Sequence, residues 1–335
     1  SKGKTCTILK KIQKILKLLK SNKNKFIDIE NKNNIDVAVI GWIQPRKAQD
    51  IISKAFIEIK GCTLEENNIV VHPLYYIVDG KEYIPGVDDM PVKDFYQALR
   101  DGKMPTTSAS NPINIISRFQ KEINEEHDIL HLSFSSGLSS SYNNAQMCAE
   151  KIMEEEPESK IIVVDTLSGT VGQGILLMHA VDMKKQGKTI EEIAKWLNDN
   201  KKHVIHEFTV SDLNHLYRGG RLSKASAVLG TMLNIQPILH MDDKGGLAAI
   251  GKVRGRKKAL HTLVDNIEKK SDVTNLKQVF ISHGDCIEDA EYVAEKIKQK
   301  YGVDDFLISD ICPTIGAHTA QGAVVVAYLG NNREE

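Results

Sequence analysis

Three short clusters of hydroxyl and glycine residues contain the side chains that are best suited to bind a ligand. They are residues 105–110 (PTTSAS), 133–141 (SFSSGLSSS) and 316–319 (GAHT). A loop of this kind that runs into a helix can hold an anion, because its backbone N–H groups and hydroxyls donate hydrogen bonds. Taken singly, each cluster is explained as well by helix caps and turns.

Several other chemistries are disfavoured by motifs that the sequence lacks. The run at 134–139 reads FSSGLS, so there is no G-x-S-x-G nucleophile motif, and neither phosphate-binding glycine pattern occurs. His203 and His206 are a weak metal signal, and the five cysteines include no C-x-x-C pair. We therefore expect no metal and no cofactor.

Basic residues gather in the second half of the chain. The run at 252–258 (KVRGRKK) contains Arg254 and Arg256, and Arg218 and Arg221 precede it. Cations near a helix N-terminus oppose the helix dipole, which indicates a partner for the charge, although a solvated helix start explains the run as well. The run lacks the interleaved aromatics of a nucleic-acid groove, and the chain is not basic overall, so we expect no nucleic-acid partner.

The elements that must position these clusters alternate between strand and helix in the first half. Strand patterns occur at 36–40, 69–78, 127–134 and 160–165, and helix patterns occur at 44–60, 91–100, 112–125, 139–154, 170–186 and 190–200. This alternation predicts a largely parallel sheet with helices on both faces. Open sheets bind ligands at the carboxyl ends of their strands, which is where the cluster at 133–141 should lie.

From about residue 201 the pattern changes. Two apolar runs, 236–241 and 248–253, flank the turn at 242–246 (DDKGG) and predict an antiparallel hairpin. Further strands are expected at 204–210, 277–283, 305–309 and 323–329, and helices after Ser223, at 256–270 and at 286–301. We therefore predict a two-domain α/β protein. A parallel-sheet α/β domain (36–200) is followed by an α+β domain with an antiparallel hairpin (201–335).

Composition limits the class of protein further. The 335 residues carry 44 basic and 44 acidic side chains and are 41% hydrophobic, enough for sizeable cores. No apolar run approaches the roughly 18–20 residues of a membrane span. The scattered cysteines are typical of a reducing compartment and favour a cytoplasmic protein.

Residues 1–35 form a Lys-rich N-terminal extension. Residues 1–25 hold nine lysines and no acid, and Ile8, Ile12, Ile15 and Leu19 recur at helical spacing. A frayed, solvated extension is the favoured interpretation. A basic amphipathic helix that contacts a membrane transiently is the alternative.

Six segments, taken together and in order, resemble the DegV family of bacterial fatty-acid-binding proteins. They span about residues 69 to 330, and one such string alone would be weak. They are PTTS at 105–108, SSGLS at 135–139, RGGRLS at 218–223, GKVRGRKKA at 251–259, HGD at 283–285 and IGAHT at 315–319.

The resemblance implies a two-domain fold that holds one long-chain fatty acid in a tunnel. Such proteins do not turn over a substrate themselves. They present the acid to a separate ATP-dependent kinase subunit, which forms the acyl phosphate. By this resemblance Thr106, Ser136 and His318 bind the carboxylate. The neighbouring residues that support the head group are Thr107, Ser108, Ser135, Gly137 and Thr319.

The four arginines are expected to dock the kinase and not to touch the fatty acid, because they cluster in loops and at a helix start. They are Arg218, Arg221, Arg254 and Arg256. A buried carboxylate held by two hydroxyls and an imidazole needs no fixed cation.

Two departures from the family pattern concern the loops. The T-D-S-[TS] string that usually follows the first strand is missing, since residues 41–44 read GWIQ. The glycines that usually follow the histidine are replaced by residues 320–322 (AQG), which restricts that backbone.

Two other functions stay open. Ser136 and His318 could act as nucleophile and base of a hydrolase or acyl transferase, although no acidic partner is identifiable. The basic segments could instead make the protein a membrane- or nucleic-acid-binding adaptor.

Overall fold

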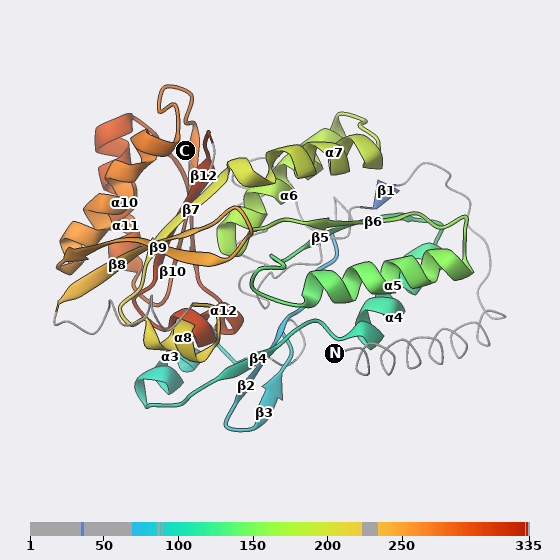
Figure 1. Cartoon of the computed structure of the whole chain (residues 1–335), viewed down its shortest axis with the longest axis horizontal. Coiled ribbons are helices and arrows are strands. Elements are labelled where there is room, and N and C mark those ends of the chain that lie inside the picture. The colour runs from blue at the N-terminus through green and yellow to red at the C-terminus, as the bar shows by residue number, and fades with distance from the viewer. Residues whose placement is uncertain are drawn as a thin grey trace.

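The computed structural model describes residues 35–36, 69–85, 88, 90–222, 234–331 and 333, and only the backbone of residues 35 and 36 (Figure 1). Residues 1–34, the expected helix at 44–60 and the expected helix after Ser223 lie outside the described residues. No helix of the described part is both long and apolar enough to cross a membrane.

One unit of the fold is a parallel sheet in the order β1–β5–β6. It consists of β1 (Ile35–Asp36), β5 (Asp128–Ser133) and β6 (Ile161–Asp165). Ile129 packs with α4 (Pro112–Asn124) and α5 (Ser141–Glu155), and its neighbour Leu130 packs with α6 (Thr170–Lys185) and α7 (Ile190–Asn200). Side chains alternate across a strand, so the two apolar faces of β5 require helices on both sides. Figure 1 shows these two helical layers, and the predicted parallel α/β arrangement is confirmed.

A second, larger sheet is mainly antiparallel and has the order β11–β10–β12–β7–β8–β9. Only β10 and β11 pair in parallel. The predicted hairpin is confirmed, with its turn at 242–246. α10 (Arg256–Lys270) and α11 (Ile287–Tyr301) cover one face. The strands are β7 (Val204–Thr209), β8 (Ile235–Met241), β9 (Leu247–Arg254), β10 (Gln278–His283), β11 (Asp305–Asp310) and β12 (Val324–Leu329).

The segment around residues 69–108 differs from the prediction. The expected long strand at 69–78 is only β2 (Tyr75–Val78), which pairs antiparallel with β3 (Lys81–Tyr83) and with β4 (Thr106–Ser108). Pro73 cannot donate a ladder hydrogen bond and lies before the strand. The hydroxyl cluster at 105–110 thus contains a strand and is not simply a loop between helices.

This small sheet is attached to the C-terminal part of the chain through two helices. Phe95 and Tyr96 of α3 (Val92–Arg100) pack against α12 (Pro313–Thr319), and the Tyr96 hydroxyl donates to the Ile311 carbonyl at 2.7 Å. The short helix α8 (Asn214–Arg218) also contacts α12. α12, which carries His318, is therefore held from two sides.

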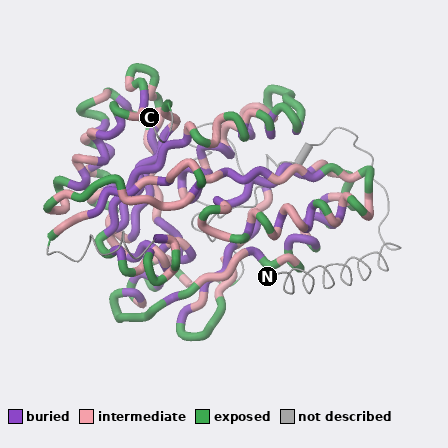
Figure 2. Tube along the Cα trace, viewed as in Figure 1, coloured by how far each residue is buried: buried purple, intermediate pink, exposed green. Residues whose placement is uncertain are grey.

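The expected boundary at residue 200 falls between α7 and a 3₁₀ turn (Lys201–His203). The core crosses this boundary, because α6 also packs against β7, β10 and β12. Leu130 and Leu176 share one buried cluster with Phe280 and Ala327. Figure 2 shows buried residues both in the six-stranded sheet and in the β1–β5–β6 sheet. The two halves are thus joined by a common core, and their division into domains stays a prediction.

Candidate functional site

A cavity lies where the carboxyl ends of β5 and β6 meet the larger sheet and α12. The empty space that it encloses, counted together with the part open to solvent, amounts to about 790 Å³. Half of the lining residues are apolar, among them Phe134, Phe208 and Val325. The remaining apolar lining residues are Leu74, Ala109, Leu138, Leu216, Met241, Leu247 and Ile315.

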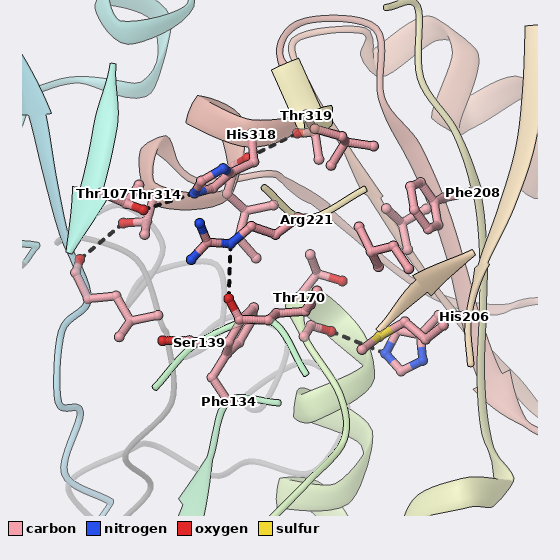
Figure 3. Close-up of a pocket in the computed structure, with 18 of the residues that line it drawn as sticks. Thr107, Phe134, Ser139, Thr170, His206, Phe208, Arg221, Thr314, His318 and Thr319 are labelled. Carbon is pink, nitrogen blue, oxygen red and sulfur yellow. Dashed lines mark hydrogen bonds between the residues drawn. The ribbon is translucent and has the colours of Figure 1, made fainter. Parts of the chain in front are cut away.

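Thr107, Thr314, His318 and Thr319 gather at one side of this cavity, with Arg221 beside them (Figure 3). Nε2 of His318 lies 2.9 Å from Oγ1 of Thr107, while the buried Nδ1 has no partner among the described residues. A neutral imidazole carries one N–H, which is best placed on Nε2, where it can donate to Thr107. The hydroxyl hydrogen of Thr107 is then free to donate to a ligand.

His318 is held neutral by its surroundings. Burial lowers its pKa to about 4, and the charges of Arg221 and Arg218 act in the same direction. An imidazole with this pKa supplies no positive charge at neutral pH. Its role is to orient the Thr107 hydroxyl.

Arg221 lies in the cavity wall, which differs from its expected place on a docking surface. Its Nε donates to the Leu138 carbonyl at 2.9 Å, and burial lowers the pKa of its guanidinium. Arg218 is exposed beside it, contacts Sδ of Met104 and donates weakly to the Ala317 carbonyl at 3.4 Å. A positive charge therefore faces the cavity beside Thr107 and His318.

The structure separates the three residues expected to bind a carboxylate. His318 lines the cavity, whereas Thr106 is exposed and lies outside the lining. Thr106 and Thr107 are neighbours in β4, so their side chains point to opposite faces. Ser136 is also outside the lining, and its N–H donates to Oδ1 of Asp165 at 3.1 Å. Ser139 is the hydroxyl of this loop that lines the cavity near its apolar wall.

The supporting residues fall into two groups. Thr107, Ser108 and Thr319 line the cavity. Ser135 and Gly137 instead anchor the loop to the hairpin turn of the larger sheet. Ser135 donates to the Gly245 carbonyl at 2.7 Å, and a Cβ at Gly137 would overlap the Lys244 and Gly245 backbone.

The two arginines of the basic run lie outside the cavity. Arg254 ends β9 and is exposed. Arg256 opens α10 and forms an ion pair of 2.7 Å with Asp289 of α11. Asp289 thus balances part of the positive charge at this helix start.

The polar lining residues that belong neither to the hydroxyl clusters nor to the basic residues noted in the sequence are His206, Thr170 and Thr314. His206 showed only a weak metal signal, and it now lies on the side of the cavity opposite His318 (Figure 3). Thr314 donates to the Leu74 carbonyl at 3.0 Å and fixes α12 to the chain before β2. Their positions depend on packing between segments that are far apart in the sequence, and a local sequence pattern does not indicate such packing.

The geometry gives little support to a Ser–His hydrolase. Nε2 of His318 is paired with Thr107, and the backbone N–H of Ser136 is bound to Asp165. Within the described part of the chain, no serine hydroxyl is hydrogen-bonded to His318. A nucleophilic mechanism would need that contact.

Comparisons with known proteins agree with this architecture. A family model described as "Uncharacterised protein, DegV family" matches residues 48–331. A DegV domain-containing protein of Clostridium perfringens is 42% identical over 258 residues, which are 77% of this chain and 89% of the relative.

Solved structures of DegV proteins are also similar to this chain. DegV from Bacillus subtilis, described as a fatty acid binding protein, has a TM-score of 0.72 at 27% identity, covering 89% of this chain and 99% of that one. A Thermotoga maritima protein whose structure "reveals fatty acid binding function" has a TM-score of 0.71 at 25% identity, covering 89% and 99%. The chain belongs to the DegV family.

Proposed function

We propose that this protein binds one long-chain fatty acid in the cavity, with the carboxylate beside Thr107, His318 and Arg221. The observation that supports this best is that half of the lining residues are apolar, while Thr107, His318 and Arg221 lie together in one part of the cavity. Burial of an acyl chain contributes about 0.8 kcal/mol per CH₂, which association entropy offsets in part. The fatty-acid binding of the Bacillus subtilis and Thermotoga maritima proteins supports the same assignment.

The head group is held by donors of two kinds. The Thr107 hydroxyl, oriented by His318, donates one hydrogen bond, and Arg221 provides the nearby positive charge. A buried carboxylate requires such partners to stay ionised. This assignment replaces Thr106 by its neighbour Thr107 and adds Arg221 to the head-group site.

The first test is mass spectrometry of the lipid extracted from the purified protein, followed by titration of the delipidated protein with a fluorescent fatty acid. We expect a near-stoichiometric fatty acid. Thr107→Val should weaken binding by about 1–2 kcal/mol, because it removes one hydrogen bond to a charged group. Thr106→Val in the same strand is the matched control and should bind normally. Equal effects of the two variants would contradict the assignment.

We further propose that the protein presents the bound acid to a separate ATP-dependent kinase, which forms the acyl phosphate. Arg218 and Arg254 are exposed and are the cations best placed for docking, while Arg221 serves the cavity and Arg256 is paired with Asp289. Arg254→Glu should slow acyl-phosphate formation and change its salt dependence, with normal fatty-acid occupancy. Reduced occupancy in Arg254→Glu would argue against a docking role.

A further inference from the structure

A single arginine near the C-terminus is buried behind the inner wall of the cavity. Arg333 is only 1% exposed. Its Nε donates to the Val204 carbonyl at 3.0 Å, and its Nη1 donates to the Asp242 carbonyl at 3.1 Å. Its Nη2 donates to the Lys201 carbonyl at 3.0 Å and to Oγ of Ser168 at 3.2 Å. One side chain therefore joins three segments that are far apart in the sequence.

Each of these segments continues into the cavity wall. Ser168 precedes the lining residues Gly169 and Thr170, and Asp242 directly follows Met241, which also lines the cavity. Val204 begins β7, the strand that places His206 in the wall. A shift of Arg333 would therefore displace the cavity wall at three places at once.

His206 forms a second bridge parallel to that of Arg333. A neutral His206 carries one N–H, which on Nε2 donates to the Gly169 carbonyl at 3.2 Å, while Nδ1 lies 3.2 Å from the Val204 carbonyl of its own strand, the carbonyl that accepts from Arg333. The two side chains thus connect β7 to the loop after β6 at adjacent points. Because β7 and β6 belong to different sheets, this pair of bridges fixes the spacing of the sheets at the cavity.

We infer that Arg333 is a positioning residue that fixes the inner wall of the cavity and thereby determines which acyl chains fit. The inference rests on the proposed fatty-acid binding. An acyl tail is selected by shape, since dispersion contacts are lost as soon as the walls separate from it. A wall joined at three points by one rigid, planar group will favour the chain length and shape that fill it.

Arginine suits this place better than lysine. The guanidinium presents five donors in a fixed plane, whereas a lysine offers one compact ammonium on a flexible stem. Lysine would keep the charge but could not reach all four acceptors in the observed geometry. Arg333→Lys and Arg333→Met therefore separate the geometry of the side chain from its charge.

The test measures binding of saturated acids of increasing length, from laurate to arachidate, to the delipidated full chain. The wild type should show a clear preference for one length. Arg333→Met should bind that best acid about five- to tenfold more weakly, as expected for lost buried hydrogen bonds, and should discriminate less between lengths. Arg333→Lys should resemble Arg333→Met more than the wild type. Ser168→Ala removes one of the four contacts and should flatten the profile slightly with little risk to folding.

The control for general destabilisation is Leu263→Ala. Leu263 is a buried residue of α10 in a cluster outside the cavity, so its truncation should lower the melting temperature and leave the length profile intact. If Arg333→Met and Arg333→Lys also keep the wild-type profile, Arg333 only stabilises the fold and the inference is wrong. A wild type that binds none of the acids would contradict the proposed function, and the inference with it.

Discussion

Two histidines line opposite sides of the cavity, and they are held in different ways. His318 has one ring nitrogen on the Thr107 hydroxyl, and its other nitrogen has no partner within the described residues. Both nitrogens of His206 face main-chain carbonyls, those of Val204 and Gly169. The His318 side therefore has donor capacity to offer a ligand, whereas the single N–H of neutral His206 is used by the Gly169 carbonyl in the loop after β6.

Each histidine also packs against a glycine. A Cβ at Gly172 of α6 would overlap the ring of His206, and a Cβ at Gly219 would overlap the ring of His318. Neither glycine has a positive φ, so each is required by close packing and not by its backbone conformation. The methyl group of an alanine at either position would press against the histidine ring. The two substitutions therefore test how firmly each ring is held.

Gly172→Ala should have the largest effect. The ring of His206 is buried and cannot retreat without breaking its hydrogen bond to the Gly169 carbonyl, so the added methyl group should cost about 1–3 kcal/mol of stability, as overpacking does. Gly174→Ala is the matched control in the same helix, because its Cβ would meet nothing within 4 Å. That control should raise stability by up to about 1 kcal/mol through helix propensity. Chemical denaturation of both variants measures the difference, and equal stabilities would mean that His206 is not firmly held.

Gly219→Ala should affect binding more than stability. The ring of His318 is held on one side only, so it can move away from the new methyl group and give up its contact with Thr107. We expect a fatty-acid affinity about tenfold lower, the loss of roughly one hydrogen bond to a charged ligand. The melting temperature should fall less than in Gly172→Ala. Titration with a fluorescent fatty acid measures the affinity, and thermal unfolding measures the stability. A larger loss of stability in Gly219→Ala than in Gly172→Ala would contradict the view that His206 is the more firmly held ring.

Most of the larger sheet could be predicted from the sequence, because its strands have clear local patterns. The hairpin around residues 242–246 and the helix at 256–270 are found where the apolar runs and turn residues indicate. The strand within residues 105–110 was harder to predict, because three consecutive hydroxyl residues show no alternation of apolar and polar side chains. The strand β4 forms there only because β2 pairs with it. Without that strand, the sequence does not indicate which of Thr106 and Thr107 faces the cavity.

The site was predictable only in part for the same reason. His318 could be placed at the cavity from its motif, but Arg221 was expected on a docking surface because the four arginines cluster in loops and at a helix start. Arg333 gives no local signal at all, since its four acceptors come from residues 168, 201, 204 and 242. Long-range contacts of this kind follow from the packing of the sheets and not from a sequence pattern.

The smallest expected effect is the influence of bound fatty acid on acid stability. Burial lowers the pKa of His318 to about 4 and that of His206 to about 3, with the charges of Arg221 and of Arg333 adding to each shift. In the unfolded chain a histidine binds a proton below about pH 6.5. The unfolded state therefore binds more protons as the pH falls from about 6.5 toward these lowered values, and stability must fall with it.

A bound carboxylate should separate the two histidines. It lies beside His318 in the proposed complex and favours the charged imidazole there, which raises the pKa of His318 and reduces its share of the acid loss. It should leave His206 unchanged, because that ring faces carbonyls and the Arg333 guanidinium. We therefore expect melting temperatures between about pH 7 and 5.5 to fall less steeply with fatty acid bound. In His318→Gln, bound fatty acid should no longer make the fall in melting temperature less steep. In His206→Gln it should still do so. The opposite pattern would place the carboxylate at the His206 side of the cavity and invert the proposed orientation of the acyl chain.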